Sequence, residues 1–256
     1  MKLKRLSILL STVALTGCAG FGLINISEAE ADGILNVIET NTDGIKIVHF
    51  SATETNDDTV TSVTLTKDTD KDYTHFLKTV TNKKDNSMLS YLDAYQFVDE
   101  GNYIVWIKEN SFNANPVCYA KLTNGENYKA AVNKFSDDAS KFAMGFAMFA
   151  FPSGYLGMIR KDYTNDYGYQ TSITYSKQIV GNKLVVEASS TFVGSNKDKA
   201  DFDTMGASII YKDNFLESGS ITRNKNNKVE SYSFTGIQIG AGVDCSRPTD
   251  WKNIVK

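Results

Sequence analysis

The stretch DDASKFAMGFAMFAF, residues 137–151, lies between two long series of strand-like segments. Small and aromatic residues recur in it at helical spacing and form one apolar stripe: Ala139, Phe142, Ala143, Phe146, Ala147 and Ala150. Four further apolar residues cover most of the remaining circumference: Met144, Met148, Phe149 and Phe151. A helix that is apolar all round must be buried on several sides. We therefore predict a central helix, capped by Ser136 and ended at Pro152, that packs against a sheet.

The segments on either side of this helix alternate polar and apolar residues with the period of two that is typical of half-buried strands. Before the helix, turns predicted at Glu100-Gly101 and Asn124-Gly125 join strands into hairpins. After it, turns predicted at 181–182, 213–214 and 226–227 join five strands into an antiparallel meander. The two series together predict one sheet of many antiparallel strands.

A second helix is predicted near the start of the domain. Ser27-Glu28-Ala29-Glu30 has capping-box spacing, and apolar residues follow at helical spacing as far as Ile38, which predicts a helix from about Glu28 to Glu39. No linker divides the chain after this point, so we assign residues 27–256 to a single domain. The predicted fold is mainly β, of the β-rich α+β kind. It is one antiparallel, strongly curved sheet or open barrel with an N-terminal helix and one central apolar helix.

The N-terminal residues predict export. A basic end, Met1–Arg5, precedes an apolar run, Leu6–Leu15, which is shorter than the roughly 20 residues that a membrane span needs and is typical of a secretory signal. The next residues, Leu15-Thr16-Gly17-Cys18, resemble the lipobox of bacterial lipoproteins. The resemblance implies that residues 1–17 are removed, that Cys18 receives a diacylglyceryl and an amide-linked acyl chain, and that residues 18–26 form a short tether. The alternative is an ordinary signal peptide cut elsewhere, with Cys18 a plain thiol.

The resemblance also implies where the protein works. By similarity to the sorting rule of enteric bacteria, Ala19 after the cysteine favours the outer membrane, and we expect the domain to face the periplasm. Its first partner is then the membrane itself, through the lipid anchor. Removal of residues 1–17 takes away three of the 27 basic residues and none of the 30 acidic ones, which leaves a formal net charge of −6. This charge, without a basic patch, argues against a nucleic-acid partner.

Two cysteines remain after lipidation, Cys118 and Cys245. In an oxidising compartment a leftover pair is more often bridged than free, so we predict a Cys118–Cys245 disulfide. The alternative is two buried, unpaired thiols.

No catalytic residue, metal or cofactor is predicted. His49 and His75 stand in strand-like runs, and the sequence has neither a Gly-x-Ser-x-Gly elbow nor zinc spacing, so we expect both to be partly buried strand residues. Asp68, Asp70 and Asp72 alternate as calcium ligands do. An EF-hand loop, however, needs glycine at the next position, where this chain has tyrosine, and we expect a solvated acidic loop instead. An enzyme stays a third possibility behind two functions without catalysis.

The first of these functions is the binding of a lipid or other apolar ligand in the concavity of the curved sheet. A curved sheet that holds an apolar helix is similar in plan to the periplasmic lipoprotein-carrier proteins, although none of their motifs is present. The predicted ligand-binding residues lie on the central helix: Phe142, Met144, Phe146, Met148 and Phe149. The alternative function is that of a structural or assembly lipoprotein, in which this helix is plain core and the outer face of the sheet contacts another envelope protein.

Overall fold

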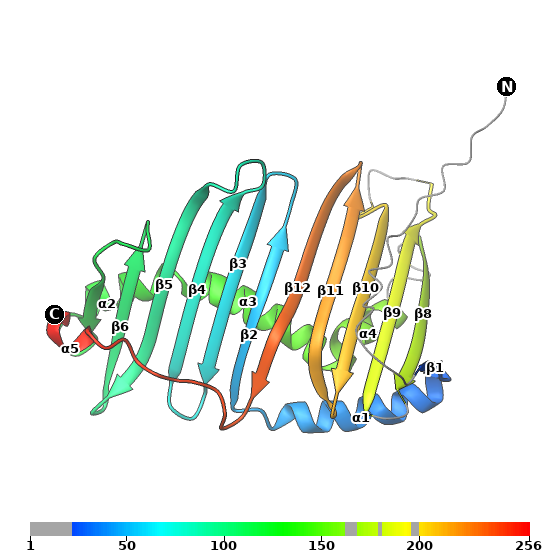
Figure 1. The fold of residues 1–256 in the computed structure, drawn as a ribbon, viewed down its shortest axis with the longest axis horizontal. Helices are drawn as coiled ribbons and strands as arrows, with labels where there is room; N and C mark the ends of the chain where they lie inside the picture. Colours follow the sequence, from blue (N-terminus) through cyan, green and yellow to red (C-terminus); the bar gives the residue numbers. More distant parts are fainter. Residues whose placement is uncertain (1–21, 162–167, 179–180, 196–199) are drawn as a thin grey trace.

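The structure is a computed structural model that describes residues 22–161, 168–178, 181–195 and 200–256. The predicted signal peptide and the first part of the predicted tether, residues 18–21 with Cys18, lie outside these ranges. In the described part, twelve strands form a single antiparallel sheet (Figure 1). The predicted mainly β fold with one antiparallel sheet is therefore confirmed.

The strands fall into two consecutive series. The first comprises β2 (Ile47–Thr55), β3 (Thr59–Asp68), β4 (Tyr73–Asn82), β5 (Met88–Asp99), β6 (Asn102–Glu109) and β7 (Val117–Ala120). The second comprises β8 (Tyr169–Gln178), β9 (Lys183–Phe192), β10 (Thr204–Lys212), β11 (Phe215–Lys225) and β12 (Lys228–Ile239). The last strand of the second series pairs with the first strand of the first, since β12 lies against β2. One continuous sheet results.

The sheet is not closed, because its two edge strands do not pair with each other. The strand order is β1-β8-β9-β10-β11-β12-β2-β3-β4-β5-β6-β7. The edge strand β1 (Leu23–Asn25) lies in the segment that the sequence analysis assigned to the tether, and it pairs with β8. The domain therefore begins about four residues earlier than predicted.

Turn residues with positive φ explain the hairpins of the meander. Asp213 and Asn214 have φ of 50° and 65°, and Asn226 and Asn227 have φ of 52° and 64°. Short polar side chains tolerate this left-handed conformation, and two such residues in succession match the twist of a two-residue hairpin. These two turns and the turn at 100–101 lie where the sequence predicted them.

The described residues form more helices than the two predicted. They are α1 (Glu28–Asp43), α2 (Gly125–Asn133), α3 (Ser136–Ala150), α4 (Pro152–Lys161) and α5 (Trp251–Ile254). The predicted cap of α1 is confirmed, because the Ser27 Oγ accepts a hydrogen bond from the Glu30 N–H at 3.2 Å. None of the helices in the described ranges is long and apolar enough to cross a membrane.

The hairpin predicted at Asn124-Gly125 is wrong. Asn124 is instead the N-cap of α2, and the segment 126–132, predicted as a strand, is helical. Tyr128 and Ala131 are buried on one side of α2, which contacts β6 and β7. A segment of seven residues is short enough for its apolar residues to fit both the helical period of 3.6 and the strand period of two. The contact of α2 with β6 and β7 stabilises the helix.

The cap predicted at Ser136 and the stop predicted at Pro152 also need correction. Phe135 is the N-cap of α3, and Ser136 is its first residue. Pro152 does not end the helical layer but begins α4, in the first helical position, where its missing N–H costs nothing.

The two faces of the sheet are covered unequally. Helices α2, α3 and α4 cross behind the sheet in Figure 1, and the larger core lies between them and the strands. On the opposite face, which we call the outer face, the C-terminal segment 240–256 covers only one end of the sheet. There Trp251 packs on Phe97 of β5, with ring centroids 5.3 Å apart, in a second and smaller core. The second core does not include residues of the seven strands that run, in sheet order, β8-β9-β10-β11-β12-β2-β3.

Candidate functional site

The structure places the five predicted ligand-binding residues on two sides of α3. Phe142, Phe146 and Phe149 are buried against the sheet. Met144 and Met148 lie on the other side of the helix and are 66% and 36% exposed. The three rings therefore belong to the core, and the two methionines belong to the surface.

Protein atoms fill the contact between α3 and the middle of the sheet. The ring of Phe146 stacks on Phe50 of β2, with centroids 4.6 Å apart and an angle of 2° between the ring planes. A Cβ on Gly145 of α3 would lie 2.9 Å from the Tyr232 hydroxyl, and a Cβ on Gly219 of β11 would lie 2.6 Å from the Phe149 ring. Neither glycine has a positive φ, so close approach of helix and strand is what requires them.

The predicted disulfide is wrong, since Cys118 and Cys245 are both free thiols. Cys118 is fully buried in β7, opposite Trp106 of β6 and bridged to Val255 on its other side. Burial, with the negative charge of Asp250, raises the pKa of the Cys118 thiol to about 12. Cys118 is part of the second core, and Cys245 packs against that core. The backbone partner of Cys118 on the side away from β6 is Val255.

Hydrogen bonds hold the C-terminal segment where the disulfide was expected. The Tyr73 hydroxyl donates to the Ser246 carbonyl at 2.8 Å, and the Trp106 Nε1–H donates to Asp250 Oδ1 at 3.0 Å. Arg247 pairs with Asp99 and also donates to a backbone carbonyl of β5. The segment is therefore attached to the sheet without a covalent bond.

The outer face of the sheet carries two long rows of hydroxyl side chains. Row A runs across eight strands and comprises Ser172, Ser189, Gly206, Thr222, Ser231, Thr55, Val60 and Thr81. Row B runs beside it and comprises Thr174, Glu187, Ser208, Ser220, Ser233, Thr53, Ser62 and Thr79. Neighbouring strands lie about 4.8 Å apart, so each row is about 34 Å long. The residues before and after them in each strand face the helices.

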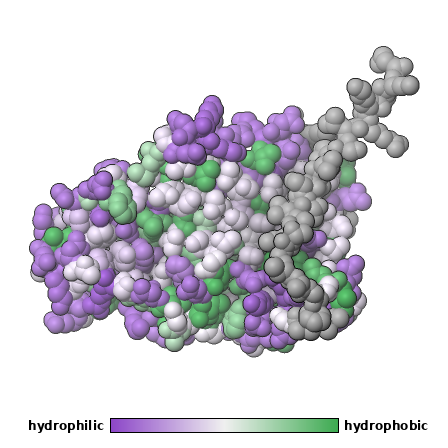
Figure 2. Space-filling model, viewed as in Figure 1, coloured by the Kyte–Doolittle hydropathy of each residue, from purple (hydrophilic) through white to green (hydrophobic). Residues whose placement is uncertain are grey.

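The side chains of rows A and B are available to a partner. All are exposed or half-buried. Among the interactions recorded for the described residues, only the Thr81 hydroxyl in these rows donates a hydrogen bond, to the Val60 carbonyl at 3.4 Å. Glu187 is the single ionisable residue of the sixteen. In Figure 2 the middle of this face is coloured near the midpoint of the hydropathy scale, and strongly hydrophilic residues gather at the margins.

Gly206 interrupts row A in the middle of β10. A Cβ at this position would meet nothing within 4 Å, and its φ is not positive. A glycine inside a strand costs about 0.5–1 kcal/mol relative to alanine. Neither the backbone nor the packing of the described residues therefore requires this glycine, in contrast to Gly219 of the adjacent strand. Such a glycine often marks a place where a ligand or another backbone approaches closely.

A third row, at one end of the outer face, holds both histidines. His49, Thr66, His75 and Tyr95 face one another across β2 to β5. His49 Nδ1 lies 2.8 Å from Thr66 Oγ1, and His75 Nε2 lies 3.0 Å from Asp93 Oδ1. The His75 ring stacks on Tyr95 with centroids 3.9 Å apart. Both histidines are partly buried strand residues, as predicted.

The environment of His49 predicts a pH-dependent stability. Burial, and to a smaller extent the charge of His75, lower the pKa of His49 in the folded protein. In the unfolded chain His49 is therefore protonated at about pH 6.5, whereas in the folded protein it is protonated only at lower pH. We expect the free energy of unfolding to fall as the pH drops from 6.5 toward the pKa of His49 in the folded protein. Uptake of one full proton on unfolding would lower it by about 1.4 kcal/mol per pH unit, and the effect of His49 should be smaller than this. Above pH 6.5 His49 should have no effect.

Urea unfolding at pH 7.5, 6.5 and 5.5 measures this effect. His49→Gln keeps a polar side chain beside Thr66 and should reduce the loss of stability between pH 6.5 and 5.5. An identical loss in the variant and the wild type would show that other groups cause it.

The aspartates that alternate as calcium ligands make contacts with the backbone, a lysine and a tyrosine. Asp68 is buried, and its Oδ1 accepts backbone N–H groups of Asp70 and Lys71 at 3.1 and 3.3 Å. Its Oδ2 has no hydrogen-bond partner among the described residues but lies 3.2 Å from the Lys71 ammonium. Asp72 accepts a hydrogen bond from the Tyr103 hydroxyl. In the described residues no group of three or more His, Cys, Asp or Glu side chains could hold a metal ion.

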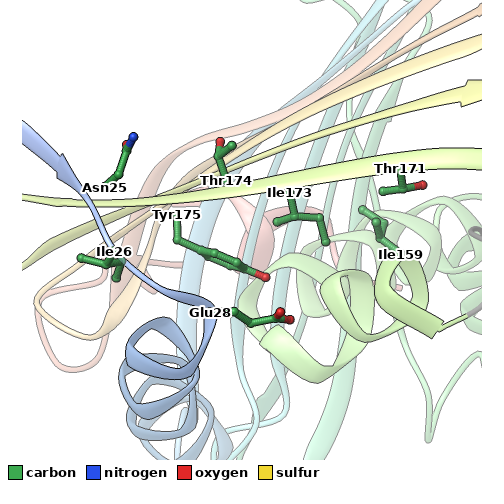
Figure 3. Close-up of a pocket in the computed structure, with 8 residues that line it drawn as sticks. All are labelled: Asn25, Ile26, Glu28, Ile159, Thr171, Ile173, Thr174 and Tyr175. Atoms are coloured by element: carbon green, nitrogen blue, oxygen red, sulfur yellow. The ribbon is translucent and has the colours of Figure 1, made fainter.

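A pocket of about 450 Å³ lies at the other end of the sheet, where β8 meets α4 and the start of α1. We call it the β8 pocket. Eight residues line it: Asn25, Ile26, Glu28, Ile159, Thr171, Ile173, Thr174 and Tyr175 (Figure 3). In Figure 3 Ile173 and Tyr175 point from β8 toward the helices, while Thr174 points to the opposite side of the strand. None of these residues was predicted as a ligand site.

No known family model matches this chain, and a search of curated proteins finds no similar sequence. The outer-face rows had a signal in the sequence, because Ser62, Thr64 and Thr66 alternate with apolar residues, and Ser51, Thr53 and Thr55 recur with the same period of two. The β8 pocket had none, since its walls are more than 130 residues apart in the chain.

Proposed function

We propose that this protein is a lipid-anchored envelope protein, without catalytic activity, that works by docking another envelope protein on rows A and B of its outer face. In this proposal Cys18 carries the lipid and holds the domain at the periplasmic side of the outer membrane. The sheet curves around α3, which is its central core helix. The observation that carries the proposal is the pair of adjacent hydroxyl-rich rows, which hold a single ionisable residue, Glu187, and in which Gly206 interrupts row A.

The burial of α3 favours this function over ligand binding in the concavity of the sheet. The stacked rings of Phe146 and Phe50 and the contact between Gly219 and Phe149 occupy the space in which the ligand was expected. A partner that reaches the protein from outside has the opposite face of the sheet available to it. The outer face is exposed to a partner whether or not Cys18 carries a lipid.

The chemistry of the rows indicates what kind of surface the partner presents. Each hydroxyl can donate one hydrogen bond and accept two, and the sixteen positions include one charge. A highly charged partner would lose hydration there without gaining an ion pair, and an apolar one would leave hydroxyl groups unsatisfied. We infer a partner with a neutral, polar protein surface, whose backbone or side-chain amides bond to the rows through direct and water-mediated contacts.

A photo-crosslinking residue on each face tests the docking. Benzoylphenylalanine at Ser220, in the middle of row B, should give a discrete adduct of higher mass in cells that express the full chain. The same residue at Met144, which is 66% exposed on the helical side, is the matched control and should not. Gly206→Val should reduce the Ser220 adduct at least fivefold, because its side chain occupies the position of closest approach. Equal adducts at both sites, or an adduct unchanged by Gly206→Val, would contradict the proposal.

A further inference from the structure

The strand β1 covers only one end of the edge of β8. Its three residues pair with residues 176–178 of β8 (Figure 1). One further backbone bond follows, in which the Ile26 N–H donates to the Tyr175 carbonyl at 3.0 Å. The chain then turns into α1, which begins at Glu28. Among the described residues, no strand therefore pairs with residues 169–174 of β8 on the side away from β9.

The register of β8 shows which backbone groups point to this open edge. In an antiparallel pair, alternate residues direct both N–H and C=O to the neighbouring strand, and the residues between them direct both away from it. The Gly168 carbonyl accepts a bond from the Val193 N–H at the end of β9, whereas the Tyr175 carbonyl faces β1. Residues of β8 with even numbers therefore bond to β9. Thr171 and Ile173 direct their backbone groups to the open edge, and neither makes a backbone hydrogen bond there with a described residue.

The β8 pocket lies where a further strand would add to this edge. Its walls include Thr171 and Ile173 of β8, and Ile26 at the point where β1 ends. They also include Thr174, which points to the opposite side of β8 from Ile173, so the space of about 450 Å³ runs along the edge of the strand (Figure 3). Ile26 and Ile173 are both half-buried and keep surface that a partner can contact. Every second side chain of an added strand would enter the pocket beside Ile173.

The opposite edge of the sheet is covered by the protein itself. Beside β7, Cys118 forms a parallel bridge with Val255, the Lys256 N–H donates to the Cys118 carbonyl at 3.0 Å, and the Ala120 N–H donates to the Lys256 carbonyl at 3.1 Å. Natural edges that are not covered usually carry charges, proline or a bulge, which prevent pairing with another chain. Residues 169–176 contain no charge and no proline, and their pairing with β9 has no register shift. The described part of β8 therefore lacks the features that block strand addition.

We propose that the open edge of β8 binds an extended, uncharged segment of a partner protein, which adds to the sheet as an antiparallel strand. The segment exchanges backbone hydrogen bonds with Thr171 and Ile173 and places short β-branched side chains in the β8 pocket. Two β8 strands of ten residues could not lie side by side here, because β1 occupies the edge from Tyr175 onward, whereas a short segment fits beside residues 169–174. This inference goes beyond the proposed function, since it depends neither on rows A and B nor on the lipid anchor.

Amide hydrogen exchange of the full chain, measured residue by residue by NMR, tests the edge itself. The amides of Thr171 and Ile173 should exchange at least tenfold faster than those of Ser172 and Thr174, which bond to β9. Equal protection of all four at every protein concentration would mean that the chain covers its own edge. Protection of Thr171 and Ile173 that rises with protein concentration would mean that a second copy covers it. Either result would overturn the proposal.

A peptide probe tests the occupant. It is acetyl-Gln-Thr-Val-Ser-Val-Thr-Gln-amide, which is uncharged and places both valines toward the pocket when it pairs with Thr171 and Ile173. In large excess it should slow exchange of these two amides at least tenfold and leave Ser172 and Thr174 within twofold. The matched control is the same peptide with N-methyl groups on both valines, which removes the donors that face β8. Equal protection by the two peptides, or no protection by either, would contradict strand addition.

A substitution in the edge gives the same test from the side of the protein. Ile173→Pro removes an N–H that points away from β9, so it breaks no bond within the sheet. It should weaken binding of the fluorescently labelled probe at least fivefold, whereas Ile173→Val keeps the N–H and should bind within twofold of the wild type. Binding that Ile173→Pro leaves unchanged would count against the proposal. If this variant does not fold, the N-methylated peptide provides the comparison on the unaltered protein.

Discussion

Replacement of Phe146 by alanine should lower the free energy of unfolding by about 3–5 kcal/mol, the usual cost of truncating a buried phenylalanine. The ring is almost fully buried on α3 and stacks on Phe50 at 4.6 Å. It also contacts Phe234 of β12 edge-on, with centroids 6.0 Å apart. The two strands that it touches, β2 and β12, are the ones that join the two halves of the sheet. Urea unfolding of the variant and the wild type measures the difference.

Met144→Ala is the matched control, because Met144 lies on the same helix and is 66% exposed. Its effect should stay within about 0.5 kcal/mol, as for other surface substitutions. A loss of less than about 1.5 kcal/mol for Phe146→Ala would mean that the ring borders an open space. In that case a ligand site along α3, as the sequence first suggested, would again be the better interpretation.

Replacement of Gly219 by valine should destabilise the fold by about 3 kcal/mol, at the upper end of the usual cost of overpacking. A Cβ at this position would lie 2.6 Å from the Phe149 ring. That ring has no free direction in which to move, since it stacks on Tyr155 and also contacts Phe234. Valine favours strands, so the loss would come from the clash and not from strand propensity. Thermal and urea unfolding both report it.

Gly206→Val makes the same substitution on the adjacent strand, where the side chain points to the outer face. Nothing lies within 4 Å of the added Cβ, so this variant should be unchanged or more stable by up to about 1 kcal/mol. Comparison of Gly219→Val with Gly206→Val therefore distinguishes the effect of close packing against a helix from the effect of strand propensity. Equal effects at the two glycines would contradict the assignment of Gly219 to core packing and of Gly206 to an open surface.

The local features of this fold could be read from the sequence because each is fixed within a few residues. The turns at 213–214 and 226–227 need residues that tolerate positive φ, and Asp and Asn supply it. The cap at Ser27 needs one side-chain oxygen three residues before the N–H that it binds. In these places the alternation of the strands and the turn chemistry agree, so the antiparallel meander followed from them.

The sequence failed where two local patterns fitted the same residues. The segment 126–132 has apolar residues compatible with either period, and only the contact of α2 with β6 and β7 selects the helix. The Cys118–Cys245 disulfide was predicted from the cysteine count and the expected oxidising compartment. The structure attaches the C-terminal segment through Tyr73, Trp106 and Arg247, contacts that no cysteine count contains.

The sequence by itself determined that the chain is mainly β, where its meander turns, and that the stretch from 137 to 151 must be covered. Those properties depend on periodicity and on residues close together in the chain. Only the tertiary structure decided that Met144 and Met148 stay outside while Phe146 is buried, that hydroxyl groups from eight strands align in rows A and B, and that residues 25–28 meet β8 at a pocket. These depend on strand register and on segments more than 100 residues apart, and no local preference of the chain encodes how such distant segments pack.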